Sequence, residues 1–393
     1  MLTRLEIENF YSIRHRQILD LAVARNAPDM PGRFGHPYLE SPQRVPKVIA
    51  LFGPNASGKS TVLRALTFLR WFARESFQIR PDENLPIMPF MQTDCWNRQI
   101  KLAVHFGAQL VENEPPCLYS YEVHIQPLQK GASAVVYEAL KYSPRGKPRR
   151  LIERTASEVK TGVEFGASDL TRQQFRPNAS VISTLAQFAH PLATKIYESL
   201  GTVLTNMFLH KFDTNPSGMT PYYSENPKVL ERLNDHVQKI DLGIERIEID
   251  QDSSGPQAKF FHRGLNQSLL LATESHGTQM FYEIFPVLNF VLSTGGLAII
   301  DELDNDIHPL VLPEMVRWFH ESSWNPHEGQ LIMSCHNPAL LEHLVKEEVF
   351  FTEKSREGVT KLFGLQDIKN VRRTDNLYRK YLGGFFGAVP RFG

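Results

Sequence analysis

The sequence predicts an α/β fold in which a mixed parallel sheet and an antiparallel sheet are combined with a helical insertion. Three observations lead to this prediction. Short apolar runs end in glycine or acidic residues and alternate with stretches of helical spacing, as in a parallel sheet with crossover helices. Other segments alternate apolar and polar residues, as antiparallel strands do. Between the two regions lies a long stretch whose spacing is mainly helical.

The apolar runs predict parallel strands at residues 47–52, 296–301 and 330–334. Helical spacing is found at residues 61–77, 277–293, 309–321 and 338–345, and two short strands follow at 349–352 and 361–363. Each of the first two runs ends at a cluster of glycine or acidic residues. Functional side chains are therefore expected at these strand ends.

The alternating segments predict antiparallel strands at residues 2–8, 99–106, 118–125 and 134–140, and a hairpin at 244–250 and 258–262. Residues 143–178 are polar and basic and are expected to form a mobile excursion, whereas 180–209 and 226–240 have helical spacing. We therefore divide the chain into an N-terminal lobe (1–142), a mainly helical insertion or recognition region (143–262) and a C-terminal lobe (263–393).

The composition is that of an ordinary globular protein, with 42% hydrophobic and 22% charged residues among 393. The 43 basic and 43 acidic side chains cancel, so the net charge implies no bulk attraction to nucleic acid or to an anionic membrane. Only three cysteines occur, without a C-x-x-C pair, which argues against a zinc site or a disulfide scaffold. This cysteine usage fits a reducing cytoplasm.

The sequence gives no sign of a membrane span. The most apolar stretch, residues 281–300, contains Glu283, Pro286 and a Gly295–Gly296 pair and continues into acidic residues. It is therefore interpreted as a buried helix, a turn and a buried strand. The N-terminal residues carry charges within their apolar alternation and lack the apolar core of a signal peptide.

The segment Gly53-Pro-Asn-Ala-Ser-Gly-Lys-Ser60 matches the phosphate-binding pattern G-x-x-x-x-G-K-[ST] in full. Glycines let backbone N–H groups converge on phosphate oxygens, and the following helix presents its positive end to the same anion. Lys59 is expected to reach the β- and γ-phosphates of ATP, and the Ser60 hydroxyl to bind Mg²⁺. The expected nucleotide contacts are Gly53, Asn55, Ala56, Ser57, Gly58, Lys59, Ser60 and Thr61.

Two further strand ends carry candidate catalytic groups. The run at 296–300 delivers Asp301 and Glu302, which we expect to act as the magnesium carboxylate and as the group that orients or deprotonates the attacking water. The run at 330–334 ends near His336, which is a candidate for hydrogen bonding to the γ-phosphate. A strand-end histidine in an ordinary loop is the alternative for His336.

Other candidates are less specific. Glu274-Ser-His-Gly-Thr-Gln279 precedes a helix, so its exposed amides predict a second phosphate-binding surface, although a simple helix cap has the same pattern. Gln92 is a candidate magnesium-sensing glutamine, and Asn305 and His308 are candidates for contact with a partner subunit. Basic clusters at residues 145–154 and 372–380 leave a nucleic-acid contact open.

Taken together, these motifs resemble those of ABC-type P-loop ATPases of the RecF/SMC/OLD group. Within that group the sequence is most similar to the compact AAA-labelled ATP-binding proteins of prokaryotic antiphage and abortive-infection systems. The resemblance spans nearly the whole chain and includes residues 7–12, the phosphate loop, 274–279, 301–309, 334–338 and 350–390. It implies that Ser275 and Gly277 contact the γ-phosphate of a neighbouring subunit, with His336 as the switch histidine.

The chain also departs from the better-known members of that group. Ser275-His-Gly-Thr-Gln279 differs from the Leu-Ser-Gly-Gly-Gln segment of transporter cassettes. A long heptad coiled coil, as in SMC proteins, is absent from the sequence, and the residues after His336 are too few for the nuclease domain of OLD proteins.

The primary hypothesis is an ATP-binding and ATP-hydrolysing sensor or scaffold of a prokaryotic antiviral defence system. ATP would close a homo-oligomer, as a sandwich dimer or larger assembly, that controls a separately encoded effector such as a TOPRIM-like nuclease. The first alternative is a RecF-like or SMC-like DNA-repair ATPase that acts directly on DNA. The second is the nucleotide-binding subunit of a transporter.

Overall fold

The computed structural model describes residues 1–127, 133–166, 175–207, 218–240, 243–253, 255–305 and 307–390. Within this part of the chain, the central sheet has the strand order β11-β15-β16-β5-β17-β18, and all neighbours are parallel except β17 and β18. Its strands are β5 (Val48–Phe52), β11 (Val203–Thr205), β15 (Leu297–Ile300), β16 (Gln330–Ser334), β17 (Val349–Lys354) and β18 (Thr360–Gly364).

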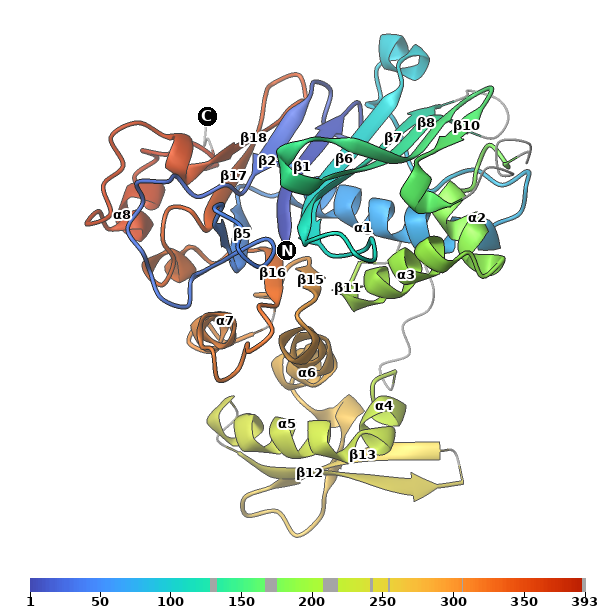
Figure 1. Ribbon diagram of the computed structural model, residues 1–393. Helices are drawn as coiled ribbons and strands as arrows, with labels where there is room; N and C mark the ends of the chain where they lie inside the picture. Colours follow the sequence, from blue (N-terminus) through green and yellow to red (C-terminus); the bar gives the residue numbers. More distant parts are fainter. Residues whose placement is uncertain are drawn as a thin grey trace.

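The antiparallel sheet has the order β10-β9-β8-β7-β6-β1-β2 and lies across helix α1 from the central sheet (Figure 1). It consists of β1 (Leu2–Glu8), β2 (Gln17–Asp20), β6 (Ile100–Ala108), β7 (Cys117–Gln126), β8 (Ala134–Ser143), β9 (Arg149–Thr155) and β10 (Val159–Thr161). The short strands β3 (Phe34–Gly35) and β4 (Val45–Pro46) form a separate pair.

Alternate residues of the central strands face two different hydrophobic cores. Ile49 and Leu51 of β5 pack with α1 (Lys59–Glu75) and the antiparallel sheet. Val48 and Ala50 of the same strand pack on the other face, against α6 (His276–Thr294) and α7 (Leu312–His320). Both faces are covered, which explains why these strands are continuous apolar runs without alternation.

The remaining helices flank this core. Helices α2 (Val181–Gln187) and α3 (Pro191–Ser199) lie beside α1, whereas α8 (Leu377–Leu382) lies near the C-terminus. An accessory unit in the lower part of Figure 1 contains α4 (Thr220–Glu225), α5 (Pro227–Ile240) and a small antiparallel sheet. Its strands are β12 (Ile244–Asp252), β13 (Gly255–His262) and β14 (Leu269–Leu270).

The predicted α/β class, with a mixed parallel sheet and an antiparallel sheet, is confirmed. So is the interpretation of residues 281–300, since α6 ends at Gly295 in a left-handed conformation (φ 77°) and β15 follows. Within the described ranges, no helix combines the length and apolar character needed to cross a membrane.

Three expectations about local structure were wrong. Residues 143–178 are not an excursion, because β9 pairs with β8 and β10 pairs with β9; residues 167–174 lie outside the described ranges. The helical interpretation of 180–209 fails at β11, and its last two residues also lie outside those ranges. The helix expected at 338–345 is a 3-10 helix, Pro338–Glu342.

The polar composition of the missed strand β9 has a structural cause. Arg154 is only 5% exposed and lies 3.7 Å from the carboxylate of the buried Glu138 on β8. A buried charge is tolerated when it has such a partner. The strand therefore carries an arginine at a buried position, where an apolar residue would have produced the alternating pattern that predicts a strand. The sheet pairing crosses residue 142, and the domain boundary proposed there stays a prediction.

Candidate functional site

The phosphate loop connects the end of β5 to the start of α1, and its backbone requires glycine at two positions. Gly53 and Gly58 have φ values of 150° and 112°, and Ala56 between them has φ 60°. A Cβ atom at Gly53 would lie 2.3 Å from the Thr352 carbonyl oxygen, and one at Gly58 would lie 2.4 Å from the Thr360 hydroxyl oxygen. Side chains are therefore excluded at both glycines by conformation and by contact.

Hydroxyl groups of the C-terminal hairpin β17–β18 hold this loop. The Ser57 and Thr352 hydroxyl oxygens are 2.6 Å apart, and Thr360 Oγ1 donates to the Ser57 carbonyl at 2.8 Å. Ser12 joins the same group, with its hydroxyl oxygen 3.0 Å from that of Thr61. Segments from both ends of the sequence thus fix the loop, which limits its rearrangement when an anion binds.

The Lys59 ammonium group lies inside the loop. Its Nζ atom donates to the carbonyl oxygens of Gly53 at 2.8 Å and Pro54 at 3.2 Å. Burial lowers the pKa of Lys59 from its usual 10.5, and the carboxylates of Asp301, Asp304 and Glu302 oppose that shift. A cation held among carbonyls near three acids is suited to receive a polyphosphate.

Asp301 is brought to the start of α1, as the sequence predicted. Its Oδ1 atom accepts hydrogen bonds from the Ser60 hydroxyl at 3.1 Å and the Ser334 hydroxyl at 2.6 Å. This contact exists because β15 and β16 are adjacent parallel strands that end at the same edge, beside the loop that follows β5. A hydroxyl and a carboxylate at this distance match the few protein ligands that Mg²⁺ uses beside phosphate oxygens and water.

Glu302 and His336 face each other at the rim of the site. The distance between His336 Nε2 and Glu302 Oε1 is 3.7 Å, and the two side chains are 37% and 52% exposed. Glu302 has φ 53°, and its backbone N–H donates to the Ser334 hydroxyl at 2.7 Å. Such a backbone conformation is uncommon outside glycine.

Glu302 and His336 border a cavity of about 1040 Å³, whose lining does not include Gly53 or Asp301. Among the predicted residues, its lining contains Asn55, Ala56, Ser57, Gly58, Lys59, Ser60, Thr61, Gln92, Glu302 and His336. Asn305 also lines it, and so do Tyr11, Met88 and Phe90, which were not predicted. The segment that carries Gln92 is positioned by Asn9, whose side chain bonds the backbone of Phe90, Cys95 and Arg98.

Two functional candidates were missed by the sequence reasoning. Asp304 Oδ2 accepts hydrogen bonds from the backbone N–H groups of His336 at 2.7 Å and Asn337 at 2.6 Å. Asn206 bonds both backbone groups of Asp301. Asp304 belongs to the acidic cluster that follows residue 300 and is visible in the sequence. Its contact with the His336 loop, however, depends on the pairing of β15 with β16. Nothing local in the sequence marks Asn206.

The predicted second phosphate-binding surface does not border the same cavity. Ser275 is the N-cap of α6, where its hydroxyl accepts from the Thr278 N–H at 3.2 Å, and Gly277 lies in the first turn of that helix. The cavity lining contains neither residue. His308 is exposed, and its Nδ1 accepts from the Leu310 N–H at 3.2 Å; Asp306 in the same loop is outside the described residues.

Most cations of the two basic clusters form ion pairs within the chain. In the first cluster, Arg149 and Arg150 pair with Glu114 and Glu153 at 3.1 Å each. In the second, Arg373 pairs with Glu347 and Lys380 with Asp375. This pairing reduces the charge that either cluster can offer to a polyanion. Among the described residues, no group of three or more histidines, cysteines or acids is arranged to hold a metal ion on its own.

The chain matches 92% of its length to the "SMC head domain from Thermotoga maritima", at 14% identity and TM-score 0.41, covering 98% of that chain. It also matches the structure titled "Crystal structure of the SmcHead bound to the C-winged helix domain of ScpA", at 13% identity and TM-score 0.47, over 93% of this chain and 98% of that one. The curated proteins contain no match.

A protein-family model matches residues 48–342, which run from β5 to the segment after His336. Its description is "AAA domain, putative AbiEii toxin, Type IV TA system". The match includes the phosphate loop, the acids that follow β15 and the histidine that follows β16. The chain therefore belongs to this AAA_21 family of P-loop, nucleotide-binding proteins.

Proposed function

We propose that this protein is a Mg²⁺-dependent ATPase that closes as a homo-oligomer and controls a separately encoded effector in a prokaryotic antiviral defence system. The observation that carries the enzymatic part is the 3.1 Å contact between Ser60 and Asp301, together with the position of Ser60, Glu302 and His336 on the wall of one cavity. The family description, which names a toxin–antitoxin system, supports the biological part.

Each residue has a distinct role in this proposal. The phosphate loop binds the triphosphate through backbone N–H groups, and Lys59 neutralises its β- and γ-phosphates. Ser60 and Asp301 would hold Mg²⁺, with Gln92 as a further ligand; the ion supplies charge stabilisation of the transferred phosphoryl group. Glu302 orients the attacking water and accepts its proton, while His336 donates a hydrogen bond to the γ-phosphate.

The position of α6 supports the homo-oligomer in this proposal. Ser275 and Gly277 lie at the start of a 19-residue helix and outside the lining of their own cavity. A helix N-terminus is suited to bind phosphate, so we assign these residues to the nucleotide of a neighbouring subunit. ATP would then join two subunits, and its hydrolysis would release them. The effector, such as a TOPRIM-like nuclease, would respond to this change.

Glu302→Gln tests the enzymatic part. The amide keeps the shape of the side chain but cannot accept a proton, so we expect ATP binding within about twofold of wild type and turnover at least about 100-fold slower. ATP should then trap a larger species in light scattering. Glu314→Gln on α7 is a matched control, because Glu314 pairs with Arg317 on the surface. Wild-type turnover by Glu302→Gln would refute this role.

A further inference from the structure

We infer that Asn206, at the end of the segment that starts at Ser180, is a positioning residue for the proposed magnesium carboxylate. The inference rests on the proposed ATPase function and adds a residue that orients its metal site. Asn206 directly follows β11, whose residues Val203–Thr205 pair in parallel with Leu297–Ile299 of β15.

The Asn206 side chain continues this pairing beyond the end of the strand. Its Nδ2 atom donates to the Asp301 carbonyl at 2.9 Å, and its Oδ1 atom accepts from the Asp301 N–H at 2.8 Å. One amide group therefore takes both backbone groups of Asp301, in the geometry of a neighbouring strand. Because Asp301 lies one residue past β15, this contact fixes the backbone from which the carboxylate reaches Ser60.

The strand that precedes Asn206 is also bound to the helix that carries Ser60. Arg70 Nε of α1 donates to the Val203 carbonyl at 3.1 Å, and the hydroxyl oxygens of Thr67 and Thr205 are 3.4 Å apart. These contacts connect Ser60 and Asp301 by a second route besides their direct hydrogen bond. Helix α1, which carries Ser60, contacts β11, and Asn206, which follows β11, contacts Asp301. A shift of β11 relative to α1 would change the distance between the two groups that hold the metal.

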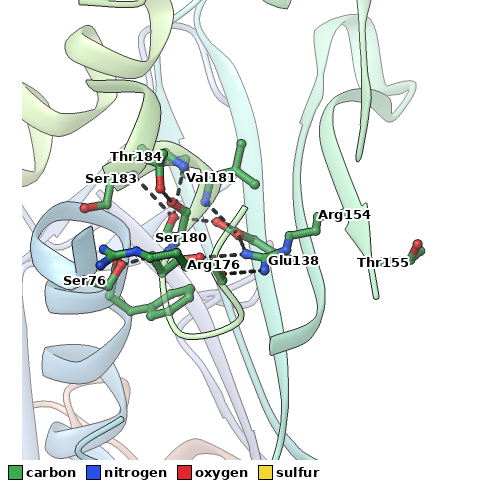
Figure 2. A network of polar contacts seen from close by, with 12 residues as sticks. Ser76, Glu138, Arg154, Thr155, Arg176, Ser180, Val181, Ser183 and Thr184 are labelled. Carbon is green, nitrogen blue, oxygen red and sulfur yellow. Dashed lines mark hydrogen bonds and ion pairs between the residues drawn. The ribbon is translucent and has the colours of Figure 1, made fainter. Parts of the chain in front are cut away.

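The other end of the segment is fixed in a buried polar network, which Figure 2 shows. The Glu138 carboxylate accepts from the Ser180 hydroxyl at 2.6 Å and the Val181 N–H at 3.0 Å, at the start of α2. The Ser180 N–H donates to the hydroxyl of Ser76, just past the end of α1, at 2.9 Å. The segment is therefore attached to α1 at both ends, and its middle also contacts α1, since the Ser183 hydroxyl of α2 donates to the Arg74 carbonyl at 3.0 Å and Arg74 lies over the Tyr197 ring of α3.

A small cavity lies at this junction, and Glu302 and Asn305 line both this cavity and the larger one beside the phosphate loop. The small cavity measures about 340 Å³ and is lined by Asn206, Asp301 and Glu302 together with Arg64, Met207, Met280 and Asn305. Met280 belongs to α6, the helix that starts at the proposed trans-acting segment. The Asn206 contact thus lies where the segment from Ser180 to Asn206, the proposed metal carboxylate Asp301 and helix α6 meet.

The test compares Asn206→Leu with Asn234→Leu. Asn234 in the accessory unit makes the same twofold contact, since its Nδ2 donates to the Ile247 carbonyl at 3.0 Å and its Oδ1 accepts from the Ile247 N–H at 2.7 Å. Both substitutions remove two hydrogen bonds to one backbone residue with the same change in side-chain volume. Only Asn206→Leu affects the contact with Asp301.

A fluorescent ATP analogue would be titrated with each purified full-length protein without metal and at increasing Mg²⁺, and Mn²⁺ binding to the nucleotide complex would be followed by electron paramagnetic resonance. We expect Asn206→Leu to bind the metal-free nucleotide within about twofold of wild type. Its apparent affinity for the metal should fall about 10- to 100-fold, as for partners that orient metal ligands. Asn234→Leu should keep wild-type metal affinity.

Wild-type metal affinity in folded Asn206→Leu would overturn the inference, as would an equal loss in Asn234→Leu. If Asn206→Leu does not fold, Asn206→Asp preserves the shape and the acceptor but places an oxygen against the Asp301 carbonyl, and the same metal loss is expected. Wild-type metal affinity in Asn206→Asp would likewise overturn it. Failure of the wild-type protein to bind the nucleotide at all would refute the proposed function instead.

Discussion

Asp304 holds the loop that carries His336 through two backbone hydrogen bonds. Its Oδ2 atom lies 2.7 Å from the His336 nitrogen and 2.6 Å from the Asn337 nitrogen. The side chain of His336 is itself 37% exposed, so the position of its ring depends largely on its backbone. Asp304 therefore links the acid-bearing loop after β15 to the histidine-bearing loop after β16.

Asp304→Ala should slow ATP hydrolysis roughly 10- to 100-fold, because the backbone of His336 would no longer be held in place. ATP affinity should stay within about twofold of wild type, because the phosphate loop keeps its own contacts. Asp304→Asn keeps an acceptor oxygen and should retain more activity than Asp304→Ala. Steady-state kinetics and nucleotide titration measure both effects. Asp367→Ala is the control, since Asp367 also accepts a loop N–H, from Gly364 at 3.2 Å. Unchanged turnover in Asp304→Ala would exclude this positioning role.

Lys59→Ala should weaken ATP binding by about 1.5–3 kcal/mol or more, roughly ten- to a hundredfold, because the phosphates lose their charge-assisted hydrogen bonds. The Gly53 and Pro54 carbonyls that Lys59 now contacts also lose their partner, so a thermal melt should accompany the calorimetric titration. The exposed Lys361 on β18 provides a control substitution. A folded Lys59→Ala protein with wild-type affinity would contradict the phosphate-loop assignment.

Glu138→Ala should destabilise the protein by about 3–5 kcal/mol, because the buried Arg154 would keep its charge but lose its carboxylate partner, while its hydrogen bonds to the carbonyls of Ala179 and Arg176 remain. The double variant Glu138→Ala/Arg154→Met should be more stable than the sum of the two single changes by at least about 1 kcal/mol. Urea denaturation measures both. Glu158→Ala, which breaks the exposed ion pair with Lys160, should change stability by less than about 1 kcal/mol. Additive single effects would show that the pair is not coupled.

The sequence predicted what is encoded locally. The Gly53–Ser60 loop needs glycine at fixed positions, and the strands β15 and β16 are apolar runs whose ends are visible in the sequence. Contacts between distant segments could not be predicted in this way. Strand β9 was missed because Arg154 has its partner on another strand, and β11 because three residues carry too little pattern to distinguish a strand from the end of a helix.

The roles of Asp304 and Asn206 depend on which strands are neighbours. Asp304 meets the His336 loop because β15 pairs with β16, and Asn206 meets Asp301 because β11 pairs with β15. Neither pairing follows from spacing along the chain, since 95 residues separate Asn206 from Asp301. The residue types that line the candidate site could therefore be predicted from the sequence, whereas the residues that position them required the sheet order.

Gly277→Arg addresses the composite site between subunits. Its side chain would start in the first turn of α6, where the proposal places the γ-phosphate of a neighbouring subunit, and would block the approach of the helix N-terminus. The variant should bind ATP with wild-type affinity, because its own phosphate loop is intact, but should lose ATP-dependent closure and most of its turnover. Thr294→Arg, at the exposed other end of α6, is the control and should keep both ATP-dependent closure and turnover.

Mixing Gly277→Arg with Lys59→Ala distinguishes a composite site from a site contained in one subunit. Each protein alone lacks one half of every interface, whereas a mixed interface contains one site with an intact loop and an intact α6 N-terminus. If subunits exchange and sites act independently, two inactive proteins should together recover up to about a quarter to a half of wild-type ATPase activity, by the symmetry of a two-fold dimer. Exchange would be verified by energy transfer between labelled subunits. Full activity of Gly277→Arg alone would remove the support for the trans contact, because the helix N-terminus would then not approach any phosphate.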